Sequence, residues 1–265
     1  MDGSRPPPPT GARAIDDPSE LVAFYSDSIA AHLYALADLE EPYWTPSTWY
    51  RRGDAVVGLV AIPGVARPTV YAMSTRDPDG TLALLADLVE GLPSGTLVLG
   101  AAGLTAAIEA RRAMAWAGPH LRYHLTDLAA VPAPAPEVAA LTASDTDRLL
   151  GLYATEPGAA FFLPIMVGDE SYVGVTDDGG RLVAAAGTHV LSERTRSAAI
   201  GGVYTLPSSR GRGLGRAVAA GAIHRIAPRV DVIGLNVAEA NAPARTIYER
   251  LGFEPLLAYE ECELA

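Results

Sequence analysis

A strand, a glycine-rich turn and a helix that follow one another over residues 198–229 constrain this sequence most. The apolar run 198–205 predicts a buried strand, and Pro228 predicts the end of the helix. Between them, Arg210-Gly-Arg-Gly-Leu-Gly215 opens the helix. Glycines let backbone N–H groups approach a ligand, and the positive end of the helix dipole favours negative charge. The stretch therefore predicts an anion-binding site.

The charges around this turn agree with an anion site. Residues 194–230 contain seven arginines and no carboxylate, although the whole chain has a net charge of −11. A local basic patch on an acidic chain indicates a small anion, because nucleic acid would need a broader basic surface. We therefore expect no nucleic-acid partner.

Three kinds of glycine loop compete for this turn. A P-loop needs a lysine, and the chain has none; a dinucleotide fingerprint needs a third glycine where Arg216 stands. Asp231 opens the next strand, whereas a ribose-binding acid would end it. The pattern that fits is Arg-x-x-Gly-x-Gly at 210–215. On this motif alone, a surface turn with solvated arginines stays an alternative.

The residues that follow predict a second strand and a second helix. Residues 231–239 read as a strand, and Ala244, Ile247, Tyr248 and Leu251 then form one helical face. The helix is bounded by a proline in its first turn and by a glycine after its last, as is usual for helix ends.

The Arg-x-x-Gly-x-Gly loop, followed by Asn241, Tyr248 and Gly252-Phe253, resembles the two signatures of the GNAT superfamily of N-acyltransferases. The stretch Tyr204-Thr-Leu-Pro207 is similar to the FR47-like branch. The resemblance implies an α/β fold of the mixed α+β kind, in which helices flank a mixed, mostly antiparallel central sheet. It also implies acetyl-CoA or another acyl-CoA as co-substrate, and no metal.

The resemblance also implies roles for individual residues. The backbone of the strand before the loop would bind the pantetheine arm, and the loop N–H groups would hold the pyrophosphate. A tyrosine hydroxyl with a pKa near 10 can protonate a thiolate whose pKa is near 8.5, and Tyr248 matches that role; a core tyrosine is the alternative. The residues implied in coenzyme binding are Val203, Tyr204, Thr205, Arg210, Gly211, Arg212, Gly213, Leu214, Gly215, Arg216 and Asn241.

The general base stays unassigned, because the strand 198–205 carries no carboxylate. Water relayed through the backbone would also serve, and the two histidines nearest the motifs are expected to be structural. The candidate bases are Glu193, Glu260, Glu261 and Glu263. The two histidines expected to be structural are His189 and His224.

Two functions remain open. The first is an acyl-CoA-dependent N-acyltransferase that moves an acetyl or short acyl group to the primary amine of a small molecule or peptide. The second is a non-catalytic acyl-CoA-binding sensor or scaffold.

Composition predicts four segments: a disordered tail (1–18), an α/β domain (19–128), an alanine- and proline-rich linker (129–136) and the acyltransferase domain (137–265). The one cysteine, Cys262, fits a reducing cytoplasm. No apolar run approaches about eighteen residues, so no membrane span is expected. A homodimer is compatible with the sequence.

The two domains also predict a repeat. At a shift of 136 residues, five identities relate Pro119, Leu121, Tyr123, Leu128 and Ala129 to Pro255, Leu257, Tyr259, Leu264 and Ala265. The first domain is therefore predicted to be a diverged second copy of the fold.

This first copy is expected to be catalytically inactive. At the same shift, Arg112 stands at the position of Tyr248 and Thr105 at that of Asn241. The stretch Arg-Asp-Pro-Asp-Gly at 76–80 stands near the phosphate loop, and its two carboxylates would repel a pyrophosphate.

Overall fold

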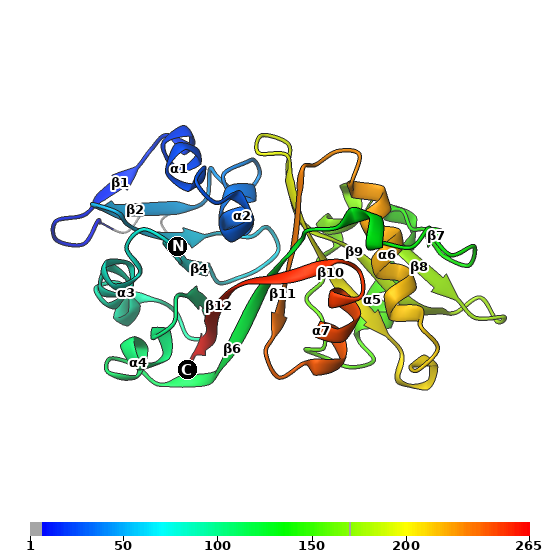
Figure 1. Ribbon diagram of the computed structural model, residues 1–265. Coiled ribbons are helices and arrows are strands. Elements are labelled where there is room, and N and C mark those ends of the chain that lie inside the picture. Colours follow the sequence, from blue (N-terminus) through cyan, green and yellow to red (C-terminus); the bar gives the residue numbers. More distant parts are fainter. Residues whose placement is uncertain (1–6, 170) are drawn as a thin grey trace. The chain divides into compact units, whose positions relative to one another are not determined.

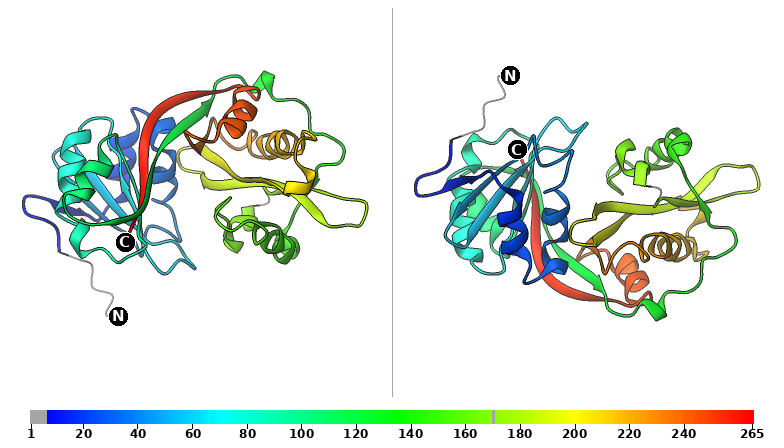
Figure 2. Two further views of the ribbon diagram at one scale, coloured as in Figure 1. Left: turned by 90° about the horizontal axis from the view of Figure 1, so that it is seen from below. Right: turned by 90° about the horizontal axis from the view of Figure 1, so that it is seen from above.

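The computed structural model describes residues 7–169 and 171–265, and its chain divides into two compact units. Unit 1 runs to Leu121 and also contains 238–240 and 257–265; unit 2 contains 122–237 and 241–256. Within each unit, helices cover both faces of a sheet (Figures 1 and 2).

When 3-10 turns of three residues are left aside, both halves of the chain have the same order of elements: a strand, two helical segments, three strands, a helix, a strand, a helix and a strand. The first half contains β1 (Arg13–Ile15), α1 (Pro18–Tyr25), α2 (Ile29–Ala37), β2 (Thr48–Arg52), β3 (Ala55–Val60), β4 (Thr69–Ala72), α3 (Pro78–Ala86), β5 (Leu97–Gly100), α4 (Leu104–Glu109) and β6 (Met114–Leu125). The second half contains β7 (Ala139–Ala140), α5 (Thr146–Tyr153), the 3-10 segment η4 (Pro164–Asp169), β8 (Val173–Thr176), β9 (Leu182–Ser192), β10 (Ser197–Thr205), α6 (Leu214–Ile226), β11 (Val232–Ala238), α7 (Ala242–Glu249) and β12 (Phe253–Leu264).

The last strand of each half completes the sheet that the other half builds. In the strand order, β1-β2-β3-β4-β5 are followed by β12, and β7-β8-β9-β10-β11 are followed by β6. Residues 257–264 of β12 belong to unit 1 and residues 122–125 of β6 to unit 2, while the rest of each strand belongs to the other unit. β12 pairs antiparallel with β5, so that Glu260 lies opposite Gly100 and Cys262 opposite Val98. The predicted domain boundaries 19–128 and 137–265 stay a prediction, and unit 1 of the structure also contains 257–265.

The sheet of each unit is mixed and mostly antiparallel. Parallel pairing joins β4 to β5 and β10 to β11, and the other strand pairs with a described register are antiparallel. The predicted fold class is thereby confirmed.

Each unit has its own apolar core. In unit 1, the side chains of Val57, Leu85 and Val98 form one buried cluster with Cys262 and Leu264 from β12. In unit 2, α6 packs on β9 and β10, where small buried residues such as Ala186 let the helix approach the sheet closely. In Figure 2, α5 lies on one face of this sheet, and α6 and α7 lie on the other.

One segment differs from the sequence prediction. The predicted disordered tail spans 1–18; its first six residues lie outside the described part of the chain, but Arg13–Ile15 form β1 and pair with β2. Within the described residues, no helix combines the length and apolar character that crossing a membrane requires.

Candidate functional site

Strands β10 and β11 separate part-way along their length. Their parallel register covers 197–199 with 232–234, while β10 continues beside β9 until Thr205 lies opposite Ala184. Among the described residues, the end of β10 therefore pairs on one side only. Backbone N–H and C=O groups need partners when they are buried. The opening thus suits an extended ligand that carries amide groups of its own.

A bulge shapes the open part of β10. The register with β9 shifts between Gly201 and Tyr204, and Gly202 has a φ of +59°, in the left-handed region that favours glycine. The hydroxyl of Tyr153, at the end of α5, donates a 2.6 Å hydrogen bond to the carbonyl oxygen of Gly202. This contact holds the bulge against the helix.

The glycine-rich turn connects β10 to the first turn of α6. Gly211 and Gly213 have φ values of +78° and +79°, which bring the chain round to the helix within a few residues. Gly213 is the N-cap, and among the described residues no side chain caps the helix there. The first N–H groups of a helix lack partners inside it, so this end is available to an anion.

Arg210 lies against the end of β10. Its Nε donates to the carbonyl oxygen of Thr205 at 3.1 Å, and its guanidinium forms an ion pair with Glu156. Tyr204 also donates to Glu156, at 3.2 Å, and its hydroxyl lies 2.9 Å from the hydroxyl of Thr155. Sequence reasoning missed Glu156, because it follows α5 in a segment without a motif.

Helix α7 brings Asn241 and Tyr248 to the same unit as the turn. Asn241 is the N-cap, and its Oδ1 accepts from the N–H of Ala244 at 3.2 Å. Burial raises the pKa of Tyr248 to about 12, and its ring meets Phe253 edge-on at 6.1 Å between centroids. The hydroxyl therefore stays protonated across the physiological range.

Gly215 shows how closely these elements approach one another. A Cβ atom placed on Gly215 would lie 3.5 Å from the hydroxyl of Thr205 and 3.6 Å from Cδ1 of Ile247. The start of α6 therefore lies between the end of β10 and α7. The structure brings together the three parts that the sequence predicted for one site.

Most of the candidate bases have other partners. Glu193 pairs with Arg229 at 2.7 Å. Glu260 belongs to unit 1, where its carboxylate accepts from the N–H groups of Gly103 at 3.0 Å and Thr105 at 2.7 Å.

Two further candidates also lie in unit 1. Glu261 accepts a 2.6 Å hydrogen bond from Tyr259, and Glu263 lies opposite Leu97 in the β5–β12 pairing. The choice of a general base therefore stays open among the predicted residues.

The two histidines lie at structural positions. His189 stacks on Phe161 with 5.2 Å between ring centroids, and burial lowers its pKa to about 4, so it is neutral at physiological pH. The Nε2 atom of His224 lies 2.9 Å from the carbonyl oxygen of Pro132.

The corresponding part of unit 1 has a different geometry. β4 pairs with β5 at all four of its positions, until Ala72 lies opposite Gly100. Asp77 caps α3 by accepting from the N–H of Gly80 at 2.9 Å, so a carboxylate already occupies that helix end. Gly103 caps α4, which makes it the counterpart of Asn241 by structure, two residues before the predicted Thr105.

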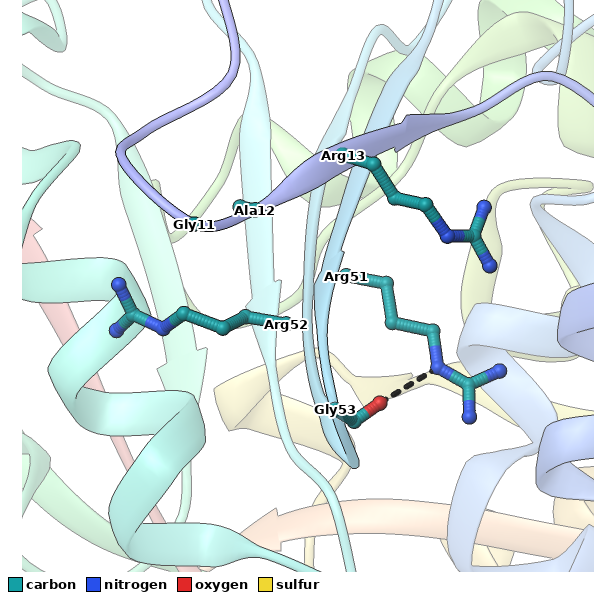
Figure 3. A pocket seen from close by; sticks show the side chains of 6 residues that line it. All are labelled: Gly11, Ala12, Arg13, Arg51, Arg52 and Gly53. Carbon is teal, nitrogen blue, oxygen red and sulfur yellow. Dashed lines mark hydrogen bonds between the residues drawn. The ribbon is translucent and has the colours of Figure 1, made fainter.

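An open hollow of about 620 Å³ lies in unit 1 beside Arg13, Arg51 and Arg52 (Figure 3). Figure 3 shows the side chains of Arg13 and Arg51 extending to one side and that of Arg52 to the other. Arg13 and Arg51 pair with Glu20, and Arg52 pairs with Asp87 at 2.8 Å. These carboxylates offset the arginine charges, so the hollow is a poor anion site.

No group of three or more histidine, cysteine, aspartate or glutamate side chains within the described ranges could hold a metal ion.

Comparisons with known proteins agree with this geometry. Residues 172–262 match the family model described as FR47-like protein. No curated protein matches the chain significantly. A solved Drosophila protein has a TM-score of 0.70 at 18% identity, over 96% of this chain and 98% of that one.

The chain has the GNAT fold. An acetyltransferase of the GNAT family from Novosphingobium aromaticivorans has a TM-score of 0.56 at 22% identity, over 81% of this chain and 89% of that one. A tandem GNAT protein from the clavulanic acid biosynthesis pathway has a TM-score of 0.54 at 16% identity, over 95% and 97%. The predicted resemblance to the GNAT superfamily and its FR47-like branch is confirmed.

Proposed function

We propose that this GNAT-fold protein is an acyl-CoA-dependent N-acyltransferase whose coenzyme site lies in unit 2. The observation that carries the proposal is the open end of β10, which leads directly into a glycine turn and an uncapped helix end. An extended amide-containing arm followed by a pyrophosphate has the shape and charge that this arrangement favours. Acetyl-CoA is the simplest ligand of this kind.

The proposed contacts divide by chemistry. The backbone of Val203, Tyr204 and Thr205 would meet the pantetheine amides. The N–H groups of the turn and of the first turn of α6 would hold the pyrophosphate, with the arginine side chains adding positive charge. The residues proposed to contact the pyrophosphate, through their N–H groups or their side chains, are Arg210, Gly211, Arg212, Gly213, Leu214, Gly215 and Arg216.

In this proposal, Asn241 acts through α7. Its side chain caps the helix that carries Tyr248, so we assign it a supporting role in the coenzyme site.

The proposed reaction is direct attack of a neutral primary amine on the thioester carbonyl. A C–N bond forms, the C–S bond breaks, and the amine gives one proton to water. Tyr248, whose raised pKa keeps its hydroxyl protonated at neutral pH, would give its proton to the departing thiolate and regain one from water. A small-molecule or peptide amine would be the acceptor, in a cytoplasmic setting without nucleic acid or membrane.

The second candidate function is an acyl-CoA-binding sensor or scaffold. It is favoured by the geometry of unit 1, where a fully paired β4 and the Asp77 cap disfavour a second coenzyme site. It is also favoured by the strand 198–205, which contains no carboxylate.

Calorimetry with acetyl-CoA tests the proposal, using Gly213→Glu and Gly213→Ala as a matched pair. Both substitutions strain the same φ of +79°, and a Cβ there would have no neighbour within 4 Å, so the pair differs in charge and in side-chain length. We expect one site per chain, weakened by alanine and abolished by glutamate. Equal affinity in the two variants would refute the loop assignment. Tight binding without transfer to any amine in a broad acceptor screen would favour the sensor.

A further inference from the structure

The helix that carries Tyr248 has few anchors of its own. α7 contains eight residues, and Tyr248 is its one buried residue. Helices this short are marginal in isolation and depend on tertiary contacts for their stability. The position of the Tyr248 hydroxyl therefore depends on what holds α7.

Tyr123 binds α7 at two points on either side of Tyr248. Tyr123 is fully buried on β6, and its hydroxyl donates to Oε1 of Glu249 at 3.0 Å. The hydroxyl oxygen of Tyr123 in turn accepts from Nε of Arg245 at 3.2 Å. Arg245 and Glu249 stand four residues apart and so share one face of the helix. One phenol oxygen thus joins two consecutive turns.

The preceding residue fixes β6 to the sheet. Arg122 is fully buried, and its Nε donates to Oδ1 of Asn236 on β11 at 2.9 Å. Successive side chains of a strand point to opposite faces. Arg122 therefore secures β6 to β11, while Tyr123 reaches α7.

We propose that Tyr123 is a positioning residue for the acyl transfer proposed above, setting the Tyr248 hydroxyl against the sulfur of the bound coenzyme. Tyr123 belongs to the last strand of the first half of the chain. The first half of the chain thus contributes a residue to the proposed site of the second half. In the first half itself, the fully paired β4 and the Asp77 cap of α3 disfavour a coenzyme site. This inference rests on the proposed function.

The repeat supplies a matched control. Tyr259, the repeat counterpart of Tyr123, is also buried, and it donates a 2.6 Å hydrogen bond to Glu261 in unit 1. Tyr123→Phe and Tyr259→Phe each remove one buried phenol oxygen and keep the ring. Only the first removes a contact to α7.

The assay uses hydroxylamine as acceptor. It is small and uncharged near neutral pH, so its acetylation needs no acceptor pocket and no general base. Its nitrogen attacks the thioester of acetyl-CoA, giving acetohydroxamic acid and the free thiol, and the sulfur still requires a proton. Thiol release above the spontaneous rate, with acetyl-CoA affinity from calorimetry, is measured for the wild type and for the Tyr248→Phe, Tyr123→Phe and Tyr259→Phe variants.

We expect Tyr123→Phe to lower kcat about tenfold to a hundredfold, because displacements of about 1 Å can have effects of this size. Affinity for acetyl-CoA should stay within about twofold, and Tyr259→Phe should match the wild type. A kcat for Tyr123→Phe within about twofold of the wild type would overturn the inference. An equal loss of kcat in Tyr259→Phe would also overturn it. So would a loss of activity in Tyr123→Phe that weaker binding of acetyl-CoA explains. If Tyr248→Phe kept full activity, the assignment of the proton donor would fail, and the role of Tyr123 with it.

Glu249 provides a second variant that leaves the core untouched, because its side chain is exposed. Glu249→Gln keeps an oxygen that accepts from Tyr123, whereas Glu249→Ala removes it. We expect glutamine to retain most of the wild-type kcat and alanine to lose it, with thermal unfolding unchanged in both. Equal activity of the two variants would contradict the inference even if Tyr123→Phe failed to fold.

Discussion

The hydroxyl of Tyr153 donates a hydrogen bond of 2.6 Å to the carbonyl oxygen of Gly202. This contact joins the end of α5 to the bulge that shapes the open part of β10. A Cβ atom on Gly202 would lie 2.7 Å from that hydroxyl and 3.0 Å from the hydroxyl of Tyr172. The bulge and the two tyrosines therefore fit together only with glycine at this position.

Gly202→Ala should lower the free energy of unfolding by about 2 kcal/mol, through left-handed backbone strain and the displaced hydrogen bond. Gly180→Ala is the control, because Gly180 has a φ of +79° and open space around it. Gly180→Ala should lower the free energy of unfolding by about 1 kcal/mol, through backbone strain alone. Urea unfolding measures both variants. Equal losses would show that the contact with Tyr153 contributes nothing.

Glu156→Gln should strengthen acetyl-CoA binding about threefold at low salt, since it removes a negative charge that pairs with Arg210 beside the phosphate turn. The stability change should stay within about 0.5 kcal/mol, because both side chains are about half exposed. Calorimetry is compared with Glu193→Gln, which breaks the exposed pair with Arg229 instead. Weaker binding in Glu156→Gln would mean that Glu156 holds Arg210 ready for the ligand.

The pKa of Tyr248 gives a pH dependence of defined sign. Burial raises this pKa from 10 to about 12, so the unfolded chain loses the proton first as pH rises. Tyr248 therefore costs no stability below about pH 10, and an increasing amount up to about pH 12. Tyr248→Phe should gain about 1.4 kcal/mol relative to wild type between about pH 9 and pH 11 in urea unfolding. A pH-independent difference between the two proteins would contradict the burial of this hydroxyl.

Asp77→Ala should lower the free energy of unfolding by about 1 kcal/mol, because it removes the N-cap of α3. It should not create a second coenzyme site, since β4 stays paired with β5 along its length. Calorimetry should still give one acetyl-CoA per chain. Two acetyl-CoA sites per chain in the variant would mean that the Asp77 carboxylate alone prevents coenzyme binding in unit 1.

Much of the candidate site could be predicted from local sequence. Gly211 and Gly213 mark left-handed positions in the turn, and Pro228 stands just beyond the end of α6. Asn241 marks the start of α7, where its side chain caps the helix. Each of these features depends on residues only a few positions away and on the strong backbone preferences of glycine, proline and asparagine. The spacing of these residues in the sequence is therefore enough to predict them.

Other features depend on residues that are distant in sequence. Glu156 meets Arg210 across 54 positions, and Tyr123 meets Arg245 across 122. Neither residue spacing nor hydrophobic periodicity predicts such contacts, because they arise only when the two segments pack together.

By itself, the sequence determined the strand, glycine turn and helix of 198–229, the strand and helix that follow them, and the repeat, because local backbone preference and hydrophobic periodicity specify each of them. Only the tertiary structure decided that β6 and β12 complete each other's sheets, because strand pairing depends on which edges are free after the remaining strands have paired. The same exchange places Tyr123 beside the helix that carries Tyr248.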